Sequence, residues 1–369
     1  MLIGAPRELK NNEYRVGLTP DATAELLSHG HQVLIESGAG LGSGFSDDNY
    51  ARAGARLVAT AAEIFDQAEL IVKVKEPLDV EVKQLRPDQV LFTYLHLAAN
   101  LDLTRGLMAS GAQCIAYETV RTPAGNLPLL APMSEIAGRL APQMGARFLE
   151  KENGGKGILL SGAPGAPPAQ LLVLGAGNVG LQSTAIALGM GARVLVADNN
   201  LDALRRVELR FGFSAQTLFA TRQTISETLT TTDLVICAAL TVGAKAPMLI
   251  DRLMLQRMSA GSVIVDVAID QGGCCETSRP TSHAQPVYAV DGVIHYCVTN
   301  MPGVVPRTST IALNNATLPY IIALANKGWR TALREDPVLA CGLEIAGGQL
   351  LSAPVASAHG LPLGKLTLG

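Results

Sequence analysis

The sequence predicts an α/β protein built from two mostly parallel sheets, and three observations lead to this fold class. Short apolar runs alternate with helix-like stretches along most of the 369 residues, which is typical of βαβ units. Hydrophobic residues make up 48% of the chain, which excludes disorder over most of it. Aromatic residues make up only 4%, and the 37 glycines allow backbones to pack closely, so an all-β sandwich is not expected.

The first third of the chain contains one series of predicted strands. They lie at 31–36 (HQVLIE), 70–75 (LIVKVK), 90–94 (VLFTY) and 114–117 (CIAY). Ala- and Leu-rich patterns between them, at 21–29 and 101–110, predict helices. This series predicts a first α/β domain.

A second series follows the Gly- and Pro-rich stretch 154–168. Its strands are predicted at 171–175 (LLVLG), 193–198 (RVLVAD), 233–238 (DLVICA) and 262–267 (SVIVDV). The chain is then irregular until a helix from about Thr310 to Lys327. Another helix is predicted near 134–151, with Ser134 as its N-cap, and these two helices are candidates to connect the domains. The weakly patterned tail, 346–369, is expected to pack on the first domain.

Charge and cysteine usage narrow the class of protein. The 29 basic and 32 acidic residues give a net charge of −3, so no basic field for nucleic acid or an anionic membrane is expected. The uncharged run 157–192 is interrupted by glycines and prolines, which argues against a membrane span. The first ten residues show no signal-peptide pattern. Six cysteines without disulfide or zinc spacing predict reduced thiols in a cytoplasmic protein.

The segment 175–180 (GAGNVG) is a G-x-G-x-x-G motif in the right context, because an apolar strand precedes it and an Ala-rich helix follows. In such a motif Gly175 permits the tight turn, Gly177 lets a pyrophosphate approach the backbone, and Gly180 allows close helix–strand packing. The N-terminus of the next helix offers free N–H groups to phosphates. The motif therefore predicts a dinucleotide site, and the alternative is a glycine-rich turn that binds no ligand.

Asp198 ends the next predicted strand, 18 residues after Gly180. An acid at this position accepts hydrogen bonds from the adenosine ribose hydroxyls and repels a 2′-phosphate, which favours NAD over NADP. Arg205 and Arg206 follow in the next helix, where a positive charge close to Asp198 would weaken this preference.

Four polar residues stand at or near predicted strand ends, where open parallel sheets bind ligands: Arg15, Lys75, His96 and Asp270. Arg and Lys can hold a carboxylate, and His with a second acid–base group can move protons near neutral pH. Each residue also has a simpler interpretation: a surface charge for Arg15, a solvated strand end for Lys75, a structural histidine for His96 and a turn acid for Asp270.

Several segments together resemble the bacterial alanine dehydrogenases that depend on NAD, a family that also includes the transhydrogenase α subunit. They are PRELKNNEYRVGLTP at 6–20, IVKVKEP at 71–77, TYLHLA at 93–98, GAGNVG at 175–180 and the long run 265–320. The resemblance covers nearly the whole chain. It implies two Rossmann-like parallel-sheet domains with an interdomain cleft. A discontinuous substrate domain would comprise 1–130 plus 305–369, and an NAD-binding domain would comprise 131–304.

The resemblance also implies residue roles. Arg15 and Lys75 match the positions that hold the substrate carboxylate, and His96 and Asp270 match the catalytic pair. Alanine stands at two positions where the family often has another residue: Ala203 replaces a common Arg and Ala220 a common Ser. The positions that contact the cofactor are Ser134, Gly175, Gly177, Asn178, Val179, Gly180, Asp198, Ala239, Leu240, Val267, Ala268, Ile269, Asp270, Arg279, Val298, Thr299, Asn300 and Met301.

The implied reaction converts L-alanine, NAD⁺ and water into pyruvate, ammonia and NADH, in a cytoplasmic homohexamer without a metal. Three alternatives stay open at this stage. They are the NAD-binding α subunit of proton-translocating transhydrogenase, a reductive saccharopine-forming dehydrogenase with a longer amino-acid substrate, and a catalytically silent NAD-binding module.

Overall fold

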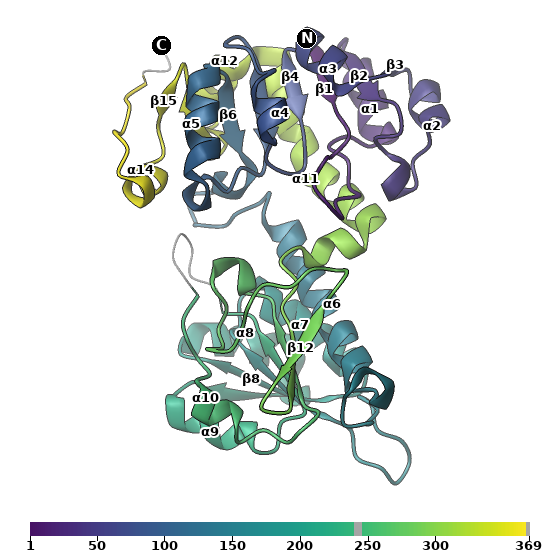
Figure 1. The fold of residues 1–369 in the computed structure, drawn as a ribbon, viewed down its shortest axis with the longest axis vertical. Helices are drawn as coiled ribbons and strands as arrows, with labels where there is room; N and C mark the ends of the chain where they lie inside the picture. Colours follow the sequence, from purple (N-terminus) through teal and green to yellow (C-terminus); the bar gives the residue numbers. More distant parts are fainter. Residues whose placement is uncertain (240–245, 367–369) are drawn as a thin grey trace. The chain divides into compact units, whose positions relative to one another are not determined.

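A computed structural model of the chain describes residues 1–239 and 246–366 and divides into two compact units (Figure 1). The first unit consists of Met1–Met133 and Val305–Gly369, and the second of Ser134–Val304. Each unit contains one mostly parallel sheet with helices, which confirms the predicted α/β class with two domains. No helix in the described part of the chain is both long and apolar enough to cross a membrane.

The sheet of the first unit has eight strands among the described residues, in the order β15-β14-β6-β5-β4-β1-β2-β3. Strands β1 to β6 pair in parallel, and β14 and β15 add an antiparallel edge. The strands are β1 (Leu2–Ala5), β2 (Gln32–Glu36), β3 (Arg56–Val58), β4 (Leu70–Val72), β5 (Val90–Thr93), β6 (Gln113–Ala116), β14 (Leu343–Ala346) and β15 (Gln349–Leu350).

Helices of the first unit join or cover these strands. They are α1 (Pro20–Ser28), α2 (Asp47–Arg52), α3 (Ala61–Gln67), α4 (Asp79–Val82), α5 (Leu101–Ser110), α11 (Pro306–Lys327), α12 (Trp329–Glu335), α13 (Pro337–Ala340) and α14 (Ala353–His359), with short 3₁₀ turns η1 (Leu41–Ser43), η2 (Leu97–Ala99) and η3 (Tyr117–Thr119). Leu350 and Val355 of the tail lie in the same buried apolar cluster as Leu91 and Leu107, so the tail packs on the first unit as predicted.

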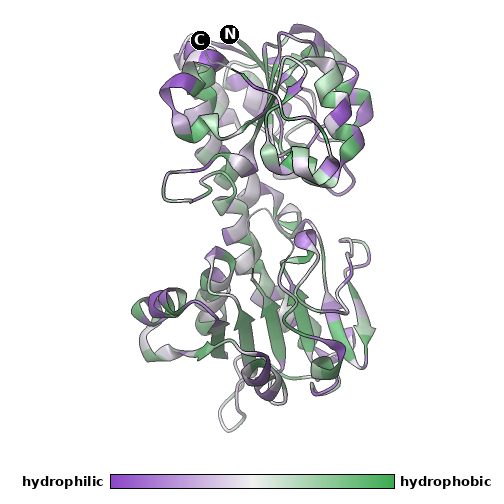
Figure 2. Ribbon diagram, turned by 90° about the vertical axis from the view of Figure 1, so that its left-hand side faces the viewer, coloured by the Kyte–Doolittle hydropathy of each residue, from purple (hydrophilic) through white to green (hydrophobic). Residues whose placement is uncertain are grey.

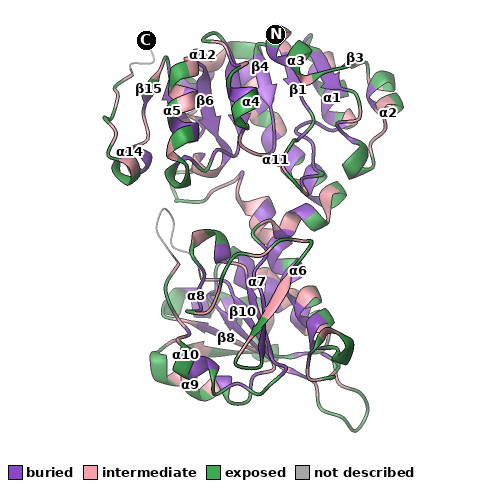
Figure 3. Ribbon diagram, in the orientation of Figure 1, coloured by how far each residue is buried: buried purple, intermediate pink, exposed green. Residues whose placement is uncertain are grey.

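The second unit has a seven-stranded sheet within its described residues, in the order β12-β13-β11-β10-β7-β8-β9. Only the β12–β13 pair is antiparallel. The strands, mostly hydrophobic in Figure 2, are β7 (Gln170–Leu174), β8 (Arg193–Asp198), β9 (Ala215–Phe219), β10 (Leu234–Cys237), β11 (Val263–Asp266), β12 (Val287–Val290) and β13 (Val293–Tyr296). Strand β10 in the centre is buried in Figure 3, whereas the edge strand β12 is mostly intermediate.

Helix α6 (Ala131–Leu149) begins in the first unit and continues in the second. The remaining helices of the second unit are η4 (Lys151–Asn153), α7 (Asn178–Gly189), α8 (Leu201–Phe211), η5 (Gly212–Ser214), α9 (Arg222–Leu229), α10 (Arg252–Leu255), η6 (Ile269–Gln271) and η7 (Met301–Val304). The central strands β7, β10 and β11 are almost fully buried, which explains why their sequences are continuous apolar runs without alternation.

Three expectations about local structure are wrong. Ser134 is not an N-cap, because α6 begins three residues earlier and Pro132 fits its first turn. Helix α11 likewise begins at Pro306 and not near Thr310. The segment expected to be irregular after the fourth strand of the second series contains the β12–β13 hairpin. Its Asp291-Gly292 turn has positive φ at both residues, and an Asp-Gly pair between apolar runs is the sequence pattern of this turn.

Candidate active site

The glycine turn of the second unit joins β7 to α7, and its three glycines serve different needs. Gly175 has a φ of +105°, and a Cβ on Gly180 would meet the carbonyl oxygen of Gly175 at 1.9 Å. These two glycines are therefore required by the turn and by its packing. A Cβ on Gly177 would meet no atom within 4 Å, although Gly177 is the N-cap of α7. Open space beside a helix N-terminus fits the pyrophosphate of a dinucleotide.

Asp198 lies at the end of β8, half-buried beside this turn. Its Oδ2 accepts the N–H of Ala176 at 2.7 Å, and its Oδ1 accepts the N–H of Asn200 at 2.8 Å. The carboxylate therefore ties the end of β8 to the glycine turn. Arg205 pairs with Asp202 at 2.5 Å on the exposed face of α8, so it is engaged away from Asp198.

Most other predicted cofactor positions lie at the edge where the parallel strands of the second sheet end. Ala239 follows β10, Val267 to Ile269 follow β11, and Val298 to Met301 follow β13. Arg279 stacks over the ring of Tyr288, 4.2 Å from its centroid. Ser134 lies elsewhere, in the first turns of α6, and Leu240 lies outside the described residues.

Arg15 is a buried residue of the first unit and not a surface charge. Its guanidinium is paired with Glu13, where Nε donates to Oε1 at 2.7 Å and Nη2 donates to Oε2 at 2.6 Å. Its Nη1 lies 3.0 Å from the Met133 sulfur. Burial lowers the pKa of Arg15, but the pairing with Glu13 more than offsets it, so the group stays charged.

Lys75 follows β4 and is half-buried, and a buried ion cluster lies beneath it. Glu8 accepts the N–H of Val74 at 2.7 Å and that of Lys75 at 3.4 Å. The Nζ of Lys73, which is fully buried, lies 3.3 Å from Glu8 and 2.7 Å from Glu81. Burial lowers the pKa of Lys73, yet the two carboxylates hold it above its usual value. The cluster therefore fixes the backbone that carries Lys75.

His96 stands after β5 in a left-handed conformation, with φ 49° and ψ 39°. Its side chain is 44% exposed, and its ring stacks on Tyr94 with centroids 5.9 Å apart. Glu118 accepts the His96 N–H at 2.6 Å, and one of its oxygens lies 3.8 Å from His96 Nδ1. An exposed imidazole on a strained and clamped backbone is typical of a functional group and not of a structural histidine.

The supporting residues of this unit were not predicted from the sequence. Glu8, Glu13, Tyr94 and Glu118 are scattered along the chain, and each is an ordinary residue in its local context. Only the alternation in LIVKVK places Lys73 and Lys75 on one side of an extended segment and hints at a charged cluster.

The chain is similar to known proteins over nearly its whole length. The family models described as "Alanine dehydrogenase/PNT" match residues 4–137 (N-terminal domain) and 141–353 (C-terminal domain). The chain belongs to the alanine dehydrogenase/PNT family. An alanine dehydrogenase of Halomonas elongata is 55% identical over 361 residues, which cover 98% of this chain and 97% of the relative.

Two solved structures of the family separate its branches. One described as L-alanine dehydrogenase matches with a TM-score of 0.94 and 49% identity over 97% of this chain and 99% of that one. A transhydrogenase from Sinorhizobium meliloti matches with a TM-score of 0.82 and 25% identity over 96% and 99%. The predicted family resemblance is confirmed, and within the family this chain is nearer to the alanine dehydrogenase in both fold and sequence.

Proposed function

We propose that this chain catalyses the reversible, NAD-dependent oxidative deamination of L-alanine to pyruvate and ammonia. The observation that carries the proposal is the full-length similarity to alanine dehydrogenases, at 55% identity for the Halomonas relative. The geometry supports it, because buried cations occur in one unit and a turn suited to a dinucleotide occurs in the other. The family makes the chain an oxidoreductase that acts on a CH–NH₂ group with a nicotinamide cofactor.

The residues of the first unit would hold and orient the substrate. Arg15 and Lys75 supply two positive charges for the alanine carboxylate, and Glu13 and Glu8 keep both groups in place. Fixing the carboxylate at two points orients the Cα–H bond, which is where the reaction starts. His96 would exchange protons with the water or the substrate oxygen, because its side chain is solvent-accessible and an imidazole can both accept and donate a proton.

The residues of the second unit would hold the cofactor and complete the proton transfers. The backbone around Gly177 would bind the pyrophosphate, and Asp198 would accept hydrogen bonds from the ribose hydroxyls. A bound nicotinamide supplies the acceptor for the hydride from the substrate Cα. Asp270, exposed in η6, would activate the water or stabilise the cationic iminium of the substrate.

A single assay tests the reaction. The appearance of NADH absorbance is followed with NAD⁺ and alanine, with NAD⁺ and lysine, and with NAD⁺ alone. We expect turnover with alanine only. Turnover with lysine and a keto acid in the reductive direction indicates a saccharopine-type enzyme, and no turnover with any amino acid refutes the proposal.

The cofactor preference provides a second test. Asp198 is a fixed negative charge, and a 2′-phosphate carries about two more charges of the same sign into a partly desolvated site. We expect kcat/KM for NAD⁺ to exceed that for NADP⁺ by at least ~100-fold, which requires about 2.7 kcal/mol. Asp198→Gly should shrink this ratio, mainly through poorer use of NAD⁺, because the carboxylate also holds Ala176 of the glycine turn. Equal efficiency with the two cofactors in the wild type would contradict the assignment of Asp198.

The assembly and location proposed for the chain follow from the family resemblance alone. We expect a cytoplasmic homohexamer, and light scattering on the purified protein would measure its mass. All six cysteines are free thiols in the structure, and Cys341 is the exposed one, in keeping with a reducing compartment.

A further inference from the structure

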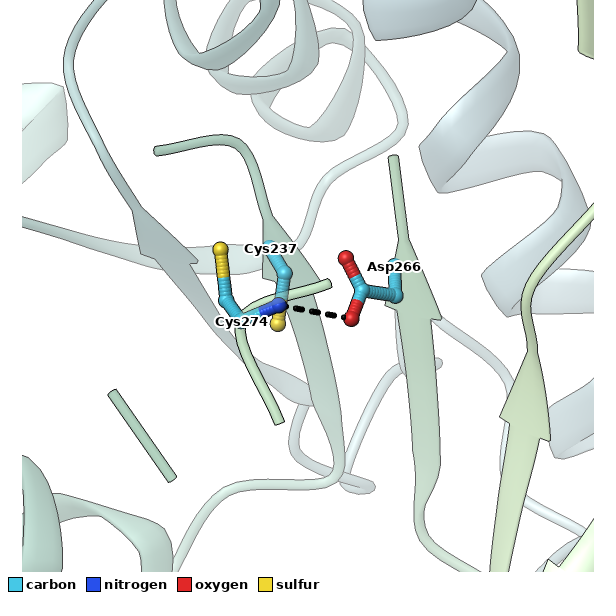
Figure 4. A group of neighbouring side chains, drawn as sticks. All are labelled: Cys237, Asp266 and Cys274. Carbon is cyan, nitrogen blue, oxygen red and sulfur yellow. Dashed lines mark hydrogen bonds between the residues drawn. The ribbon is translucent and has the colours of Figure 1, made fainter. Parts of the chain in front are cut away.

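A fully buried group of side chains lies under the turn that carries Asp270. It consists of Cys237 at the end of β10, Asp266 at the end of β11, and Cys274 (Figure 4). One ligand atom from each residue lies within 4.8 Å of the others. Such a set resembles a metal site, so the state of each group decides its role.

The hydrogen bonds of the group favour an anchor over a metal centre. Asp266 Oδ1 accepts the N–H of Ala268 at 3.1 Å, and Oδ2 accepts the N–H of Cys274 at 2.9 Å and the hydroxyl of Ser278 at 2.6 Å. Both oxygens are thus engaged by protein donors. A hydrogen bond with Cys274 and burial raise the pKa of the Cys237 thiol well above its usual value.

The bonds of Asp266 hold both ends of one short arc of chain. Ala268 lies directly before η6 and Cys274 lies three residues after it, and Asp270 is the middle residue of η6. The arc closes through Gly272 and Gly273, whose φ values are +98° and +79°. A Cβ on Gly273 would meet Asp266 Oδ2 at 2.7 Å, so the backbone of the turn packs directly against the carboxylate.

We propose that Asp266 is a positioning residue that fixes the turn on which Asp270 acts. This inference rests on the proposed function, in which Asp270 takes part in proton transfer. A buried carboxylate that accepts three protein donors restrains the arc at both ends. Asp270 is exposed at the apex of this arc, so its position follows the restrained backbone on either side of it.

The test is a double-mutant cycle with kcat measured at saturating alanine and NAD⁺. In Asp266→Asn the amide nitrogen replaces an acceptor, so the side chain cannot serve all three donors. We expect Asp266→Asn to lower kcat by 10- to 100-fold, since a displacement of about 1 Å at a reacting group costs about 10²-fold. In the Asp270→Asn background, the same substitution should lower the remaining kcat by less than about threefold.

Two further variants keep the test decisive. Ser278→Ala removes one donor with little disturbance, and we expect a three- to tenfold loss of kcat that again disappears in the Asp270→Asn background. Asp233→Asn is the matched control, because Asp233 also accepts a backbone N–H, from Gln170 at 2.9 Å, but it precedes β10 at the opposite end of that strand. The control should keep kcat within about twofold of the wild type.

The outcomes separate the inference from the proposed function. If Asp270→Asn alone turns over at the wild-type rate, the catalytic assignment of Asp270 is wrong. A second outcome is that Asp270→Asn is impaired while Asp266→Asn or Ser278→Ala lowers kcat by the same factor in the Asp270→Asn background as in the wild type. In that case Asp266 does not act through Asp270, and the inference is overturned. A kcat within twofold of the wild type for both Asp266→Asn and Ser278→Ala also overturns it.

Discussion

The two units support their functional groups in different ways. In the first unit, charged side chains rest on buried charges: Glu13 pairs with Arg15, and the Glu8–Lys73–Glu81 cluster fixes the segment before Lys75. In the second unit, the proposed cofactor site is mainly backbone, formed by the glycine turn and the strand ends around it. The first arrangement draws on residues far apart in the chain, whereas the second is a local motif.

This difference has an energetic consequence. Buried ions are costly to desolvate, and removing one partner of a buried pair leaves an uncompensated charge that costs about 3–5 kcal/mol. Lys73, at 0% exposure with carboxylates on two sides, is such a group. Substitutions of the buried ions that support Arg15 and Lys75 are therefore expected to affect folding and activity together. The glycine turn, in contrast, offers positions where a substitution changes cofactor binding without affecting folding.

The largest expected effect is a loss of turnover, and it should leave the affinity for the cofactor unchanged where the substituted residue belongs to the first unit. His96→Ala should lower kcat on the order of 10²-fold or more, as expected for an acid–base group, and Asp270→Asn should do the same. NADH affinity, measured by fluorescence titration, should be unchanged in His96→Ala, because His96 belongs to the unit without the glycine turn.

His29→Ala is the control for this pair, because His29 is a comparably exposed histidine of the same unit whose ring contacts Glu25 and Asn326 and none of the proposed site residues that the structure describes. It should retain the wild-type kcat. Near wild-type turnover in both His96→Ala and Asp270→Asn would show that the catalytic pair is wrongly assigned.

The next expected effect is a loss of cofactor affinity through a substitution in the glycine turn. A valine at Gly177 meets no protein atom within 4 Å of its Cβ, so Gly177→Val should fold with an unchanged melting temperature. The same side chain would occupy the space needed by the pyrophosphate, and we expect NADH affinity to fall about 10²-fold. Gly189→Val, in equally open space at the far end of α7, should leave the affinity unchanged. Equal affinities in the two variants would mean that the cofactor does not approach Gly177.

The contrast between the units also explains how much the sequence predicts. The strand–turn–helix of the second unit carries its own pattern in consecutive residues, so the motif and Asp198 were located without a structure. Lys75 and His96 were found because they end or follow predicted strands, and Arg15 because it lies in a polar loop at a position that matches the family resemblance. Glu8 and Glu118 were missed because they reach their partners only through the fold, and no spacing rule links Glu118 to His96 across 22 residues. Glu13 lies two residues before Arg15, but this spacing alone does not indicate a buried ion pair.

The antiparallel parts of the fold were missed for a related reason. Strands β14 and β15 are short, and they form by pairing within the sheet: β14 pairs with β6, and β15 pairs with β14. Tertiary pairing therefore outweighs local propensity at that edge. In contrast, eight of the parallel strands were predicted to within three residues, since continuous apolar runs are required wherever both faces of a sheet are covered, whereas β1, β3 and β9 were not predicted.

A buried acid in the first unit, without a charged partner among the described residues, allows a test of how burial affects stability. Glu344 on β14 is buried, and its Oε2 has no hydrogen-bond partner. Burial, aided by the nearby Glu118 charge and only partly offset by Ser352 and Thr119, raises its pKa from 4.5 to about 7. Because the folded pKa is raised above the usual 4.5, this stability is fully present below about pH 4.5, falls as the pH rises towards 7, and is lost above pH 7.

From these pKa values, the free energy of unfolding should fall by about 2 kcal/mol between pH 5 and pH 8 through Glu344 alone. Glu344→Gln should remove this part of the pH dependence and unfold at higher denaturant concentration than the wild type at pH 8. Glu335→Gln, which removes an exposed partner of Lys327, should leave the slope between pH 5 and pH 8 unchanged. An unaltered slope in Glu344→Gln would show that Glu344 ionises normally in the folded protein.

The smallest expected effect concerns the geometry of the substrate clamp. Glu13 occupies the Nε and Nη2 atoms of Arg15, so the guanidinium is held in one orientation before any substrate binds. In Arg15→Lys, a single ammonium must serve both Glu13 and the substrate carboxylate. The positive charge is kept, but the planar, pre-oriented donor set is lost.

We therefore expect Arg15→Lys to raise KM for both alanine and pyruvate about tenfold, since a hydrogen bond to a charged group is worth roughly 1.5–3 kcal/mol and part of it survives. NADH affinity should not change, because the glycine turn lies in the other unit. Arg7→Lys, at an exposed arginine paired with Glu36, is the control and should leave both KM values as they are. If KM for both substrates is unchanged in Arg15→Lys, Arg15 does not hold the carboxylate, and the buried Glu13–Arg15 pair serves the fold of the first unit alone.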